Sequence, residues 1–209
     1  MKERIDVTTI PVVDYAKNDL DDFFDRQDIE NRILLINDAI TEDIVYYQTM
    51  HILRWNAEDR YLPEDKRRPI TIYINSKGGS QIDGQALIDV IRTSKTTVRT
   101  VCLGMAASMA FLIYIAGHDR YAFPNACLLM HEGEQSVTNS VSKTRDVMQF
   151  FDEMDERVKN YILEMTDIDK EFYESVYKKE FWMYAEKAKE LGVVDQIIGQ
   201  DCDINVLFD

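Results

Sequence analysis

Short apolar segments of strand length alternate with amphipathic segments of helical length through most of this chain. The strand-like segments are residues 33–36, 69–75, 98–103, 126–131 and 193–198. The helix-like segments are residues 41–55, 82–91, 106–116, 141–165, 169–178 and 185–191. When strands and helices alternate in this way, the strands usually lie parallel in one sheet and the helices cross over between them. The sequence therefore predicts an α/β fold.

The first 30 residues depart from this alternation, and we interpret them as an N-terminal arm. They are polar and predicted to be irregular, apart from a short apolar piece at residues 9–13. They contain no apolar stretch of the kind that a secretory signal requires. Residues 31–209 show no repeat, low-complexity segment or internal linker, so they are predicted to form a single domain.

Charge and cysteine content exclude several classes of function. The formal net charge is −14, whereas nucleic-acid binding requires a concentrated basic surface. No apolar run approaches the roughly 20 residues that span a bilayer. The three cysteines, Cys102, Cys127 and Cys202, form no close pair, which argues against a disulfide framework or a zinc site. We expect a cytoplasmic protein with buried, unreactive thiols that binds neither nucleic acid nor membrane and needs no metal or other cofactor.

Three places at strand ends carry the residue types that acyl transfer needs, namely a nucleophile, a base and backbone donors. Ser108 follows a strand and opens a helix among small residues, where free N–H groups gather. His131 ends an apolar strand, and Gly78-Gly79 follow another. Each signal also has an ordinary explanation: a helix-capping serine, a hydrogen-bonded core histidine or a tight turn.

The order and spacing of these segments are more informative than any one of them. Residues 73–79 (YINSKGG), 104–110 (GMAASMA) and 123–131 (FPNACLLMH) together resemble the proteolytic subunit of Clp protease, ClpP. The likeness extends from about residue 20 to residue 198, and includes the E-L-G-x-V-D pattern that ends at Asp195.

This resemblance implies a ClpP/crotonase-type fold of repeated βαβ units, with residues 141–165 as a projecting handle helix. It implies a serine endopeptidase with Ser108 as nucleophile and His131 as general base. The backbone N–H groups of Gly79 and Met109 would form the oxyanion hole. By the same resemblance, homo-oligomeric rings, either a heptamer or a double heptamer, would enclose a chamber. An AAA+ Clp ATPase would feed peptides or unfolded proteins into it.

Several positions depart from the family pattern. Lys77 replaces a proline before the glycine pair, and the Pro-Gly-Gly stretch expected after the histidine is missing. The aspartate that would complete the catalytic triad falls on Val176, and a neighbouring arginine of the ring-to-ring contact falls on Ser175. A neutral histidine needs its second ring nitrogen held in one tautomer. Among the acids nearby, Glu171, Glu174 and Glu180, the last two are the best candidates for that task.

Two other functions stay open at this point. A catalytically impaired ring subunit could serve as a scaffold, which Val176 favours and the presence of both Ser108 and His131 opposes. An acyl-CoA enzyme of the crotonase type could use the same scaffold and a glycine-lined oxyanion hole, because fold alone does not fix function. Such an enzyme has no need of a serine and a histidine at these two places.

Overall fold

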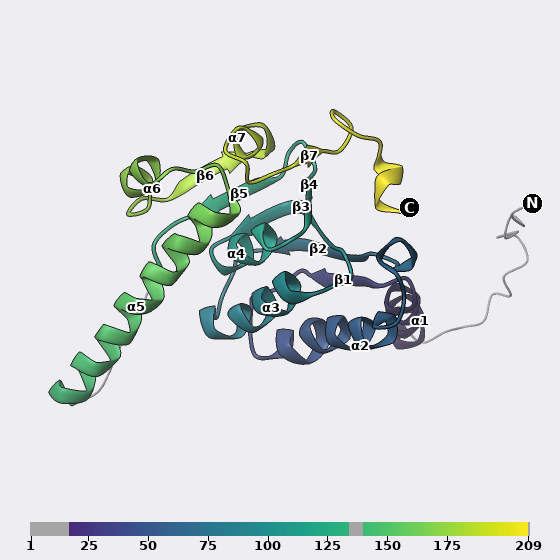
Figure 1. The fold of residues 1–209 in the computed structure, drawn as a ribbon, viewed down its shortest axis with the longest axis horizontal. Coiled ribbons are helices and arrows are strands. Elements are labelled where there is room, and N and C mark those ends of the chain that lie inside the picture. The colour runs from purple at the N-terminus through teal and green to yellow at the C-terminus, as the bar shows by residue number, and fades with distance from the viewer. Residues whose placement is uncertain (1–16, 134–139, 209) are drawn as a thin grey trace, which may run out of the picture.

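The computed structural model of this protein describes residues 17–133 and 140–208 (Figure 1). The apolar piece predicted at residues 9–13 lies outside that part of the chain. No helix within the described part is long and apolar enough to cross a membrane.

A seven-stranded sheet forms the centre of the molecule, and its main path is wholly parallel, which confirms the predicted α/β class. The path runs through β1 (Ile33–Ile36), β2 (Ile70–Ser76), β3 (Val98–Ala107), β4 (Asp119–Ala122) and β7 (Gln196–Ile197). Two further strands branch from it. β5 (Cys127–Met130) lies parallel to the end of β3, and β6 (Phe181–Tyr184) lies antiparallel to β5.

β3 changes its neighbour half-way along, and this change sets the position of Ser108. Its first half pairs with β4 through Arg99–Cys102, and its second half pairs with β5 through Met105–Ala107. The prediction that Gly104 ends this strand was wrong, since the strand runs on to Ala107. A Cβ at Gly104 would lie 2.9 Å from the Asn75 amide oxygen, which is the end of an exposed side chain that can move aside. The register between β2 and β3 shifts in this region, and the longer β3 brings Ala107 beside Leu129.

The helices that follow these strands cover the sheet, and α4 is the most deeply placed of them. α2 (Met50–Asp59), α3 (Gln81–Thr93) and α4 (Met109–Ile115) lie on one side of the sheet (Figure 1). All seven residues of α4 are buried, as its uniformly apolar sequence requires. On the other side of the sheet, the 3₁₀ turn η4 (Ile204–Leu207) brings Leu207 against Val101 and Tyr121.

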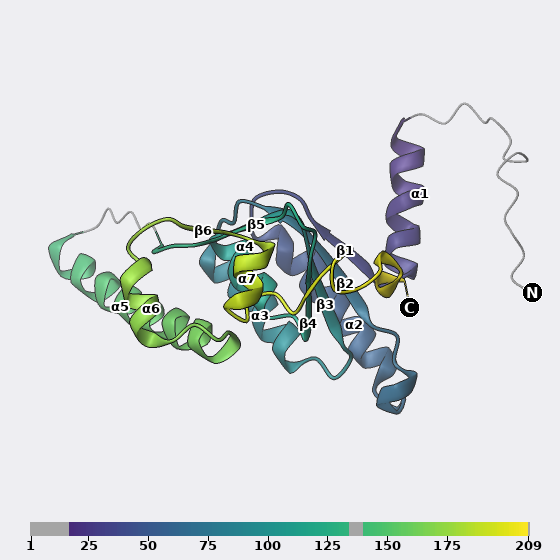
Figure 2. The same ribbon diagram turned by 90° about the horizontal axis from the view of Figure 1, so that it is seen from above.

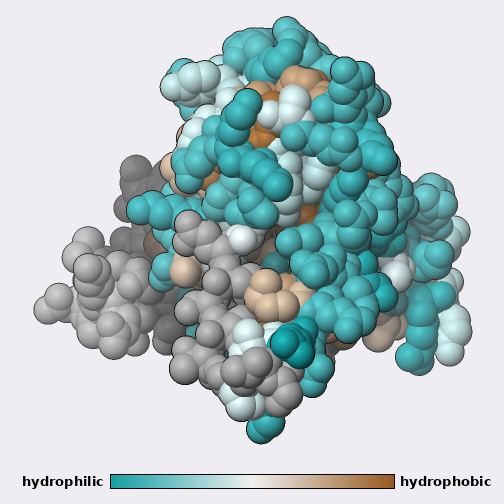
Figure 3. All heavy atoms as spheres, turned by 90° about the vertical axis from the view of Figure 1, so that its left-hand side faces the viewer, coloured by the Kyte–Doolittle hydropathy of each residue, from teal (hydrophilic) through white to brown (hydrophobic). Residues whose placement is uncertain are grey.

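α5 (Val141–Met165) projects from the body of the molecule, as predicted for residues 141–165 (Figures 1 and 2). It is followed by α6 (Lys170–Val176) and α7 (Ala185–Glu190). The side of the molecule on which α5 and α6 lie is mostly hydrophilic, and apolar residues show in recesses between the polar ones (Figure 3). This surface agrees with the large negative charge of the chain.

Several other predicted elements needed correction. The arm predicted to be irregular contains α1 (Lys17–Glu30), whose high charge hides its helical spacing; its Ile29 packs on the core. The helix expected over residues 41–55 begins as a π-helical turn, η2 (Val45–Thr49), and continues to Asp59. The helix expected from residue 106 starts at Met109, because β3 occupies the residues before it. Neither β4 nor β6 was predicted.

The cysteines follow the prediction in part. All three thiols are free, and Cys102 is buried in β3, where burial raises the pKa of its thiol to about 12. Cys127 and Cys202 are only partly buried, so the expectation that Cys127 is buried was wrong. Cys127 is on β5, which has only the short strand β6 beyond it.

A buried ion pair joins the start of the sheet to the end of α2. Arg32 lies at the end of α1 with a φ of 59° and is 8% exposed, and Asp59 is 2% exposed. Nη1 and Nη2 of Arg32 donate to the two carboxylate oxygens of Asp59 at 2.5 and 2.8 Å. The Thr96 hydroxyl donates to the same carboxylate at 2.7 Å. These donors, above all the guanidinium, hold the pKa of Asp59 below its usual range.

Candidate active site

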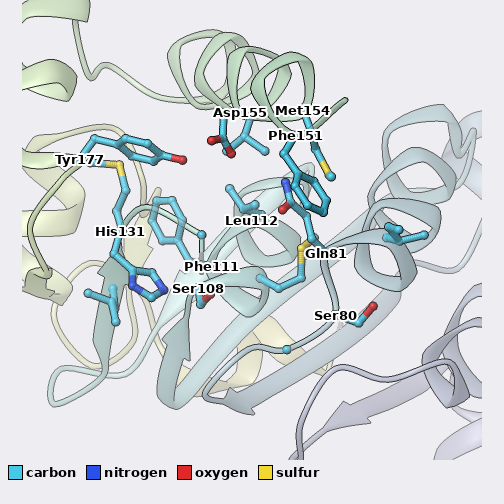
Figure 4. A pocket seen from close by; sticks show the side chains of 17 residues that line it. Ser80, Gln81, Ser108, Phe111, Leu112, His131, Phe151, Met154, Asp155 and Tyr177 are labelled. Atoms are coloured by element: carbon cyan, nitrogen blue, oxygen red, sulfur yellow. The ribbon is translucent and has the colours of Figure 1, made fainter. Parts of the chain in front are cut away.

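One cavity of about 340 Å³ brings together the four site residues singled out in the sequence (Figure 4). Gly79, Ser108, Met109 and His131 all line it, although they come from three separate parts of the chain. The cavity extends from these residues to α5, and both polar and apolar side chains line its walls. The apolar side chains include Phe111 and Leu112 from α4 and Phe151, Met154 and Val158 from α5.

Ser108 stands at the junction of β3 and α4 in a strained backbone conformation. Its φ of 56° and ψ of −123° lie in a region that non-glycine residues rarely adopt, at a cost of roughly 1–3 kcal/mol. Its N–H donates to the Leu129 carbonyl at 3.1 Å, and its carbonyl accepts from the N–H of Phe111 at 3.0 Å. Ser108 holds the N-cap position of α4, but its side chain makes no capping hydrogen bond. The hydroxyl is therefore not engaged as an ordinary helix cap.

The glycine pair lies directly against this junction. Gly78 has a φ of 93°, and a Cβ there would be 2.5 Å from the Ala107 carbonyl oxygen and 2.8 Å from the Met109 nitrogen. Only a residue without a side chain allows the loop to approach so closely. Backbone atoms of the glycine loop therefore pack directly against backbone atoms of the β3–α4 junction.

Among the described residues, the backbone N–H groups of Gly79 and Met109 have no hydrogen-bond acceptor in the surrounding structure. The Ile40 N–H donates to the Gly78 carbonyl at 2.9 Å, and the Ser80 N–H donates to the Ile40 carbonyl at 2.8 Å. This parallel bridge directs the N–H of Gly79 away from Ile40. The N–H of Met109 belongs to the first residue of α4 and has no acceptor within the helix.

His131 follows β5 and is partly buried. Its Nε2 atom is enclosed and has no hydrogen-bond partner among the residues that the structure describes. Buried polar atoms are nearly always paired, so an unpaired ring nitrogen that lines a cavity makes His131 a candidate to receive a ligand or reacting group. His131 and Ser108 lie at the same end of the cavity (Figure 4).

Comparison with known proteins agrees with this arrangement. The sequence model of the family described as Clp protease matches residues 20–201. The chain belongs to the Clp protease family. It is 30% identical over 179 residues to the ATP-dependent Clp protease proteolytic subunit 2 of Bacillus licheniformis. That match covers 85% of this chain and 90% of the relative.

Within this Clp protease family member, the acids predicted to replace the lost aspartate are not brought to the cavity. Val176, the last residue of α6, packs against the core and has no polar group to offer. Glu174 is exposed and pairs with Lys159 at 3.1 Å, and Glu180 is exposed and accepts a hydrogen bond from Trp182 at 3.1 Å. Glu171, the third acid considered, is exposed as well, and none of the three lines the cavity.

Two cavity residues, Asp155 and Tyr177, were missed by the sequence analysis (Figure 4). Tyr177 follows α6, stacks on Tyr173 with ring centroids 4.6 Å apart, and accepts the Glu132 N–H at its carbonyl at 2.9 Å. The end of α6 is thereby tied to the residue after His131. Asp155 lies on α5 within the apolar stripe that contains Phe151. An acid that interrupts a helical apolar stripe was the available signal.

The site offers no set of metal ligands. Within residues 17–133 and 140–208, no cluster of three or more histidine, cysteine or acidic side chains is arranged to hold an ion. The hydroxyl of Ser108, the imidazole of His131 and the backbone N–H groups of Gly79 and Met109 are groups of this cavity that could act on a carbonyl, and Asp155 and Tyr177 line it as well.

Proposed function

We propose that this member of the Clp protease family is a serine endopeptidase that hydrolyses peptide bonds in unfolded polypeptides. The proposal rests on two features of one cavity. The backbone of Ser108 is strained and its hydroxyl makes no capping hydrogen bond, and the Nε2 atom of His131 is unpaired. Strained backbone at a residue with a free nucleophile is typical of active sites, where the fold maintains it for function.

The proposed reaction uses these groups in sequence. His131 accepts the proton of the Ser108 hydroxyl as its oxygen attacks the carbonyl carbon of the substrate. The N–H groups of Gly79 and Met109 donate hydrogen bonds to the oxyanion that forms. His131 then gives the proton to the departing amine, and water hydrolyses the acyl-enzyme by the same steps.

The loss of the triad aspartate weakens this machinery without removing it. When the orienting acid of a serine–histidine pair is lost, the rate falls by about 10⁴-fold, yet catalysis above the uncatalysed reaction remains. We therefore infer a slow peptidase. The position of Val176 is the specific observation that favours the second candidate, an inactive ring subunit that acts as a scaffold.

Reaction with a fluorophosphonate, followed by intact-mass measurement, tests the proposal. The wild-type chain is expected to gain one adduct, and Ser108→Ala is expected to gain none. Ser175→Ala is the matched control, because Ser175 is exposed on α6 and its hydroxyl only donates to the Phe172 carbonyl. Absence of an adduct on folded wild-type protein would favour the scaffold. Labelling at Ser108 would exclude the acyl-CoA enzyme, which needs no nucleophile there.

We further infer that the chain forms homo-oligomeric rings, a heptamer or a double heptamer, in the cytoplasm. Family membership supports this, and so do Met148 and Phe150, which are 47% and 54% exposed on the projecting helix α5. Exposed apolar side chains on a projecting element favour contact with another copy. Light scattering at micromolar concentration is the test. A single species of 24.4 kDa would contradict the inference.

An AAA+ Clp ATPase is the expected partner, because the sequence has no phosphate-binding loop with which to use ATP itself. The relative's name describes an ATP-dependent protease subunit. Spontaneous unfolding of a typical substrate domain costs about 5–15 kcal/mol, so few molecules would be open to cleavage without an unfoldase. Rates should be compared for a folded protein, its unfolded form and a short peptide, all without ATPase. Equal rates on all three would contradict an enclosed chamber.

A further inference from the structure

Asp155 is the one carboxylate among the described residues that line the cavity, and its neighbours there include several apolar side chains (Figure 4). Phe151, Met154 and Val158 lie beside it on α5, and Leu112 lies on the facing helix α4. No lysine or arginine is among the described residues that line this cavity. The carboxylate of Asp155 makes no hydrogen bond or ion pair with any residue in the described part of the chain.

The charges around Asp155 make its ionised form harder to accommodate. Burial raises the pKa of this carboxyl, and the nearby acids Glu132, Asp152 and Glu156 raise it further. A partly buried carboxylate is ordinarily accompanied by a cation or by donors that offset the loss of water. Among the described residues, acids rather than a cation lie near Asp155, so a positively charged ligand could provide the missing counter-charge.

We propose that Asp155 is a specificity-determining residue that selects substrates with lysine or arginine immediately before the cleaved bond. This inference rests on the proposed peptidase function. In acyl transfer at Ser108, that substrate side chain must lie next to the nucleophile, where the cavity begins. The methylene stem of a lysine or arginine packs against Leu112, Phe151 and Met154, as such stems do on apolar surfaces. Its charged head then meets Asp155.

Tyr177 supports the same recognition from the opposite wall. Its hydroxyl is directed toward the side of the cavity on which Asp155 lies (Figure 4). A phenol oxygen can accept a hydrogen bond from an ammonium or guanidinium group as well as donate to a carboxylate. A basic side chain would therefore find two acceptors, whereas leucine would leave the carboxylate unpaired.

The test compares two fluorogenic peptides that differ only in lysine or leucine before the scissile bond. The wild-type chain should give the higher kcat/KM with the lysine peptide. Asp155→Asn keeps the shape and removes the charge, so it should lower the lysine-to-leucine ratio by roughly tenfold or more, as expected for a charge-assisted contact. Glu153→Gln is the matched control, because this acid is exposed on the same helix, does not line the cavity and is not among the acids that raise the pKa of Asp155.

A binding measurement separates this inference from the proposed chemistry. Ser108→Ala protein, with and without Asp155→Asn, is titrated with the same two peptides, and binding is followed by fluorescence anisotropy. Selective binding of the lysine peptide that depends on Asp155 supports the inference, even if no variant hydrolyses either peptide and the peptidase proposal fails. A ratio of lysine to leucine that Asp155→Asn leaves unchanged, in hydrolysis or in binding, overturns it.

Discussion

Replacement of Gly78 by alanine measures how far the site depends on the fit of the glycine loop against the start of α4. At a φ of 93°, an L residue meets a backbone cost of roughly 1–2 kcal/mol. The new Cβ would also lie 2.5 Å from the Ala107 oxygen and 2.8 Å from the Met109 nitrogen, and neither backbone atom can rotate away. The loop and the helix start must therefore separate by roughly 1 Å, a displacement that costs about a hundredfold in rate at a catalytic site.

Gly199→Ala provides the matched control for this experiment. Gly199 has a φ of 83°, yet nothing lies within 4 Å of the position that its Cβ would take. The control therefore carries the backbone cost alone. The assay pairs kcat/KM on a short fluorogenic peptide with the urea midpoint of each variant.

Gly78→Ala should lose about a hundredfold in kcat/KM, equal to about 2.7 kcal/mol of transition-state stabilisation, while Gly199→Ala stays near the wild-type value. Both variants should remain folded and show a lower urea midpoint. The reasoning is refuted if Gly78→Ala keeps activity within threefold of wild type, or if Gly199→Ala loses as much as Gly78→Ala.

Three further results are expected. Ser108→Ala and His131→Ala should each lower peptide hydrolysis by about 10³-fold or more with unchanged circular dichroism, and near wild-type turnover in either would remove that residue from the mechanism. Glu174→Ala and Glu180→Ala should each leave the rate within about threefold, because both acids are engaged outside the cavity; a larger loss would restore the one responsible as the orienting acid. Asp59→Asn should destabilise the fold by up to about 3–5 kcal/mol at pH 7, since it removes the main partner of a buried arginine and leaves it only the exposed Glu58 and the Arg68 carbonyl. The folded-state pKa of Asp59 is lowered, so its stabilising effect is full above about pH 4 and is lost as the pH falls through that lowered pKa; urea denaturation should show the variant and wild type converging at low pH.

The sequence predicted the parallel core well because its strands are mostly apolar. β1 and β2 were located to within a residue or so, since short and mostly apolar runs of that length are typical of buried parallel strands. The projecting helix α5 was found with its full bounds, because its apolar stripe extends over many turns. Ser108, His131 and the glycine pair could be found as strand-end residues, and the structure places Ser108, His131 and Gly79 around one cavity.

The remaining features depend on contacts that local pattern does not encode. β4 begins with Asp119 and Arg120, which form ion pairs with Arg99 and Asp195, so a strand was hidden by charge. β6 is defined by its antiparallel pairing with β5 across a large separation in sequence. In the sequence, Asp155 is one residue within a long amphipathic helix. Its place in the site depends on the packing of α5 against the cavity.

The conformation of Ser108 also bears on how this chain is maintained by selection. Glycine would adopt a φ of 56° without penalty, so Ser108→Gly would make the fold more stable by removing the strain at the β3–α4 junction. A subunit that served only as a scaffold would gain stability from Ser108→Gly and lose no function. Serine at this strained position is the trade-off between stability and activity that the proposed peptidase function predicts.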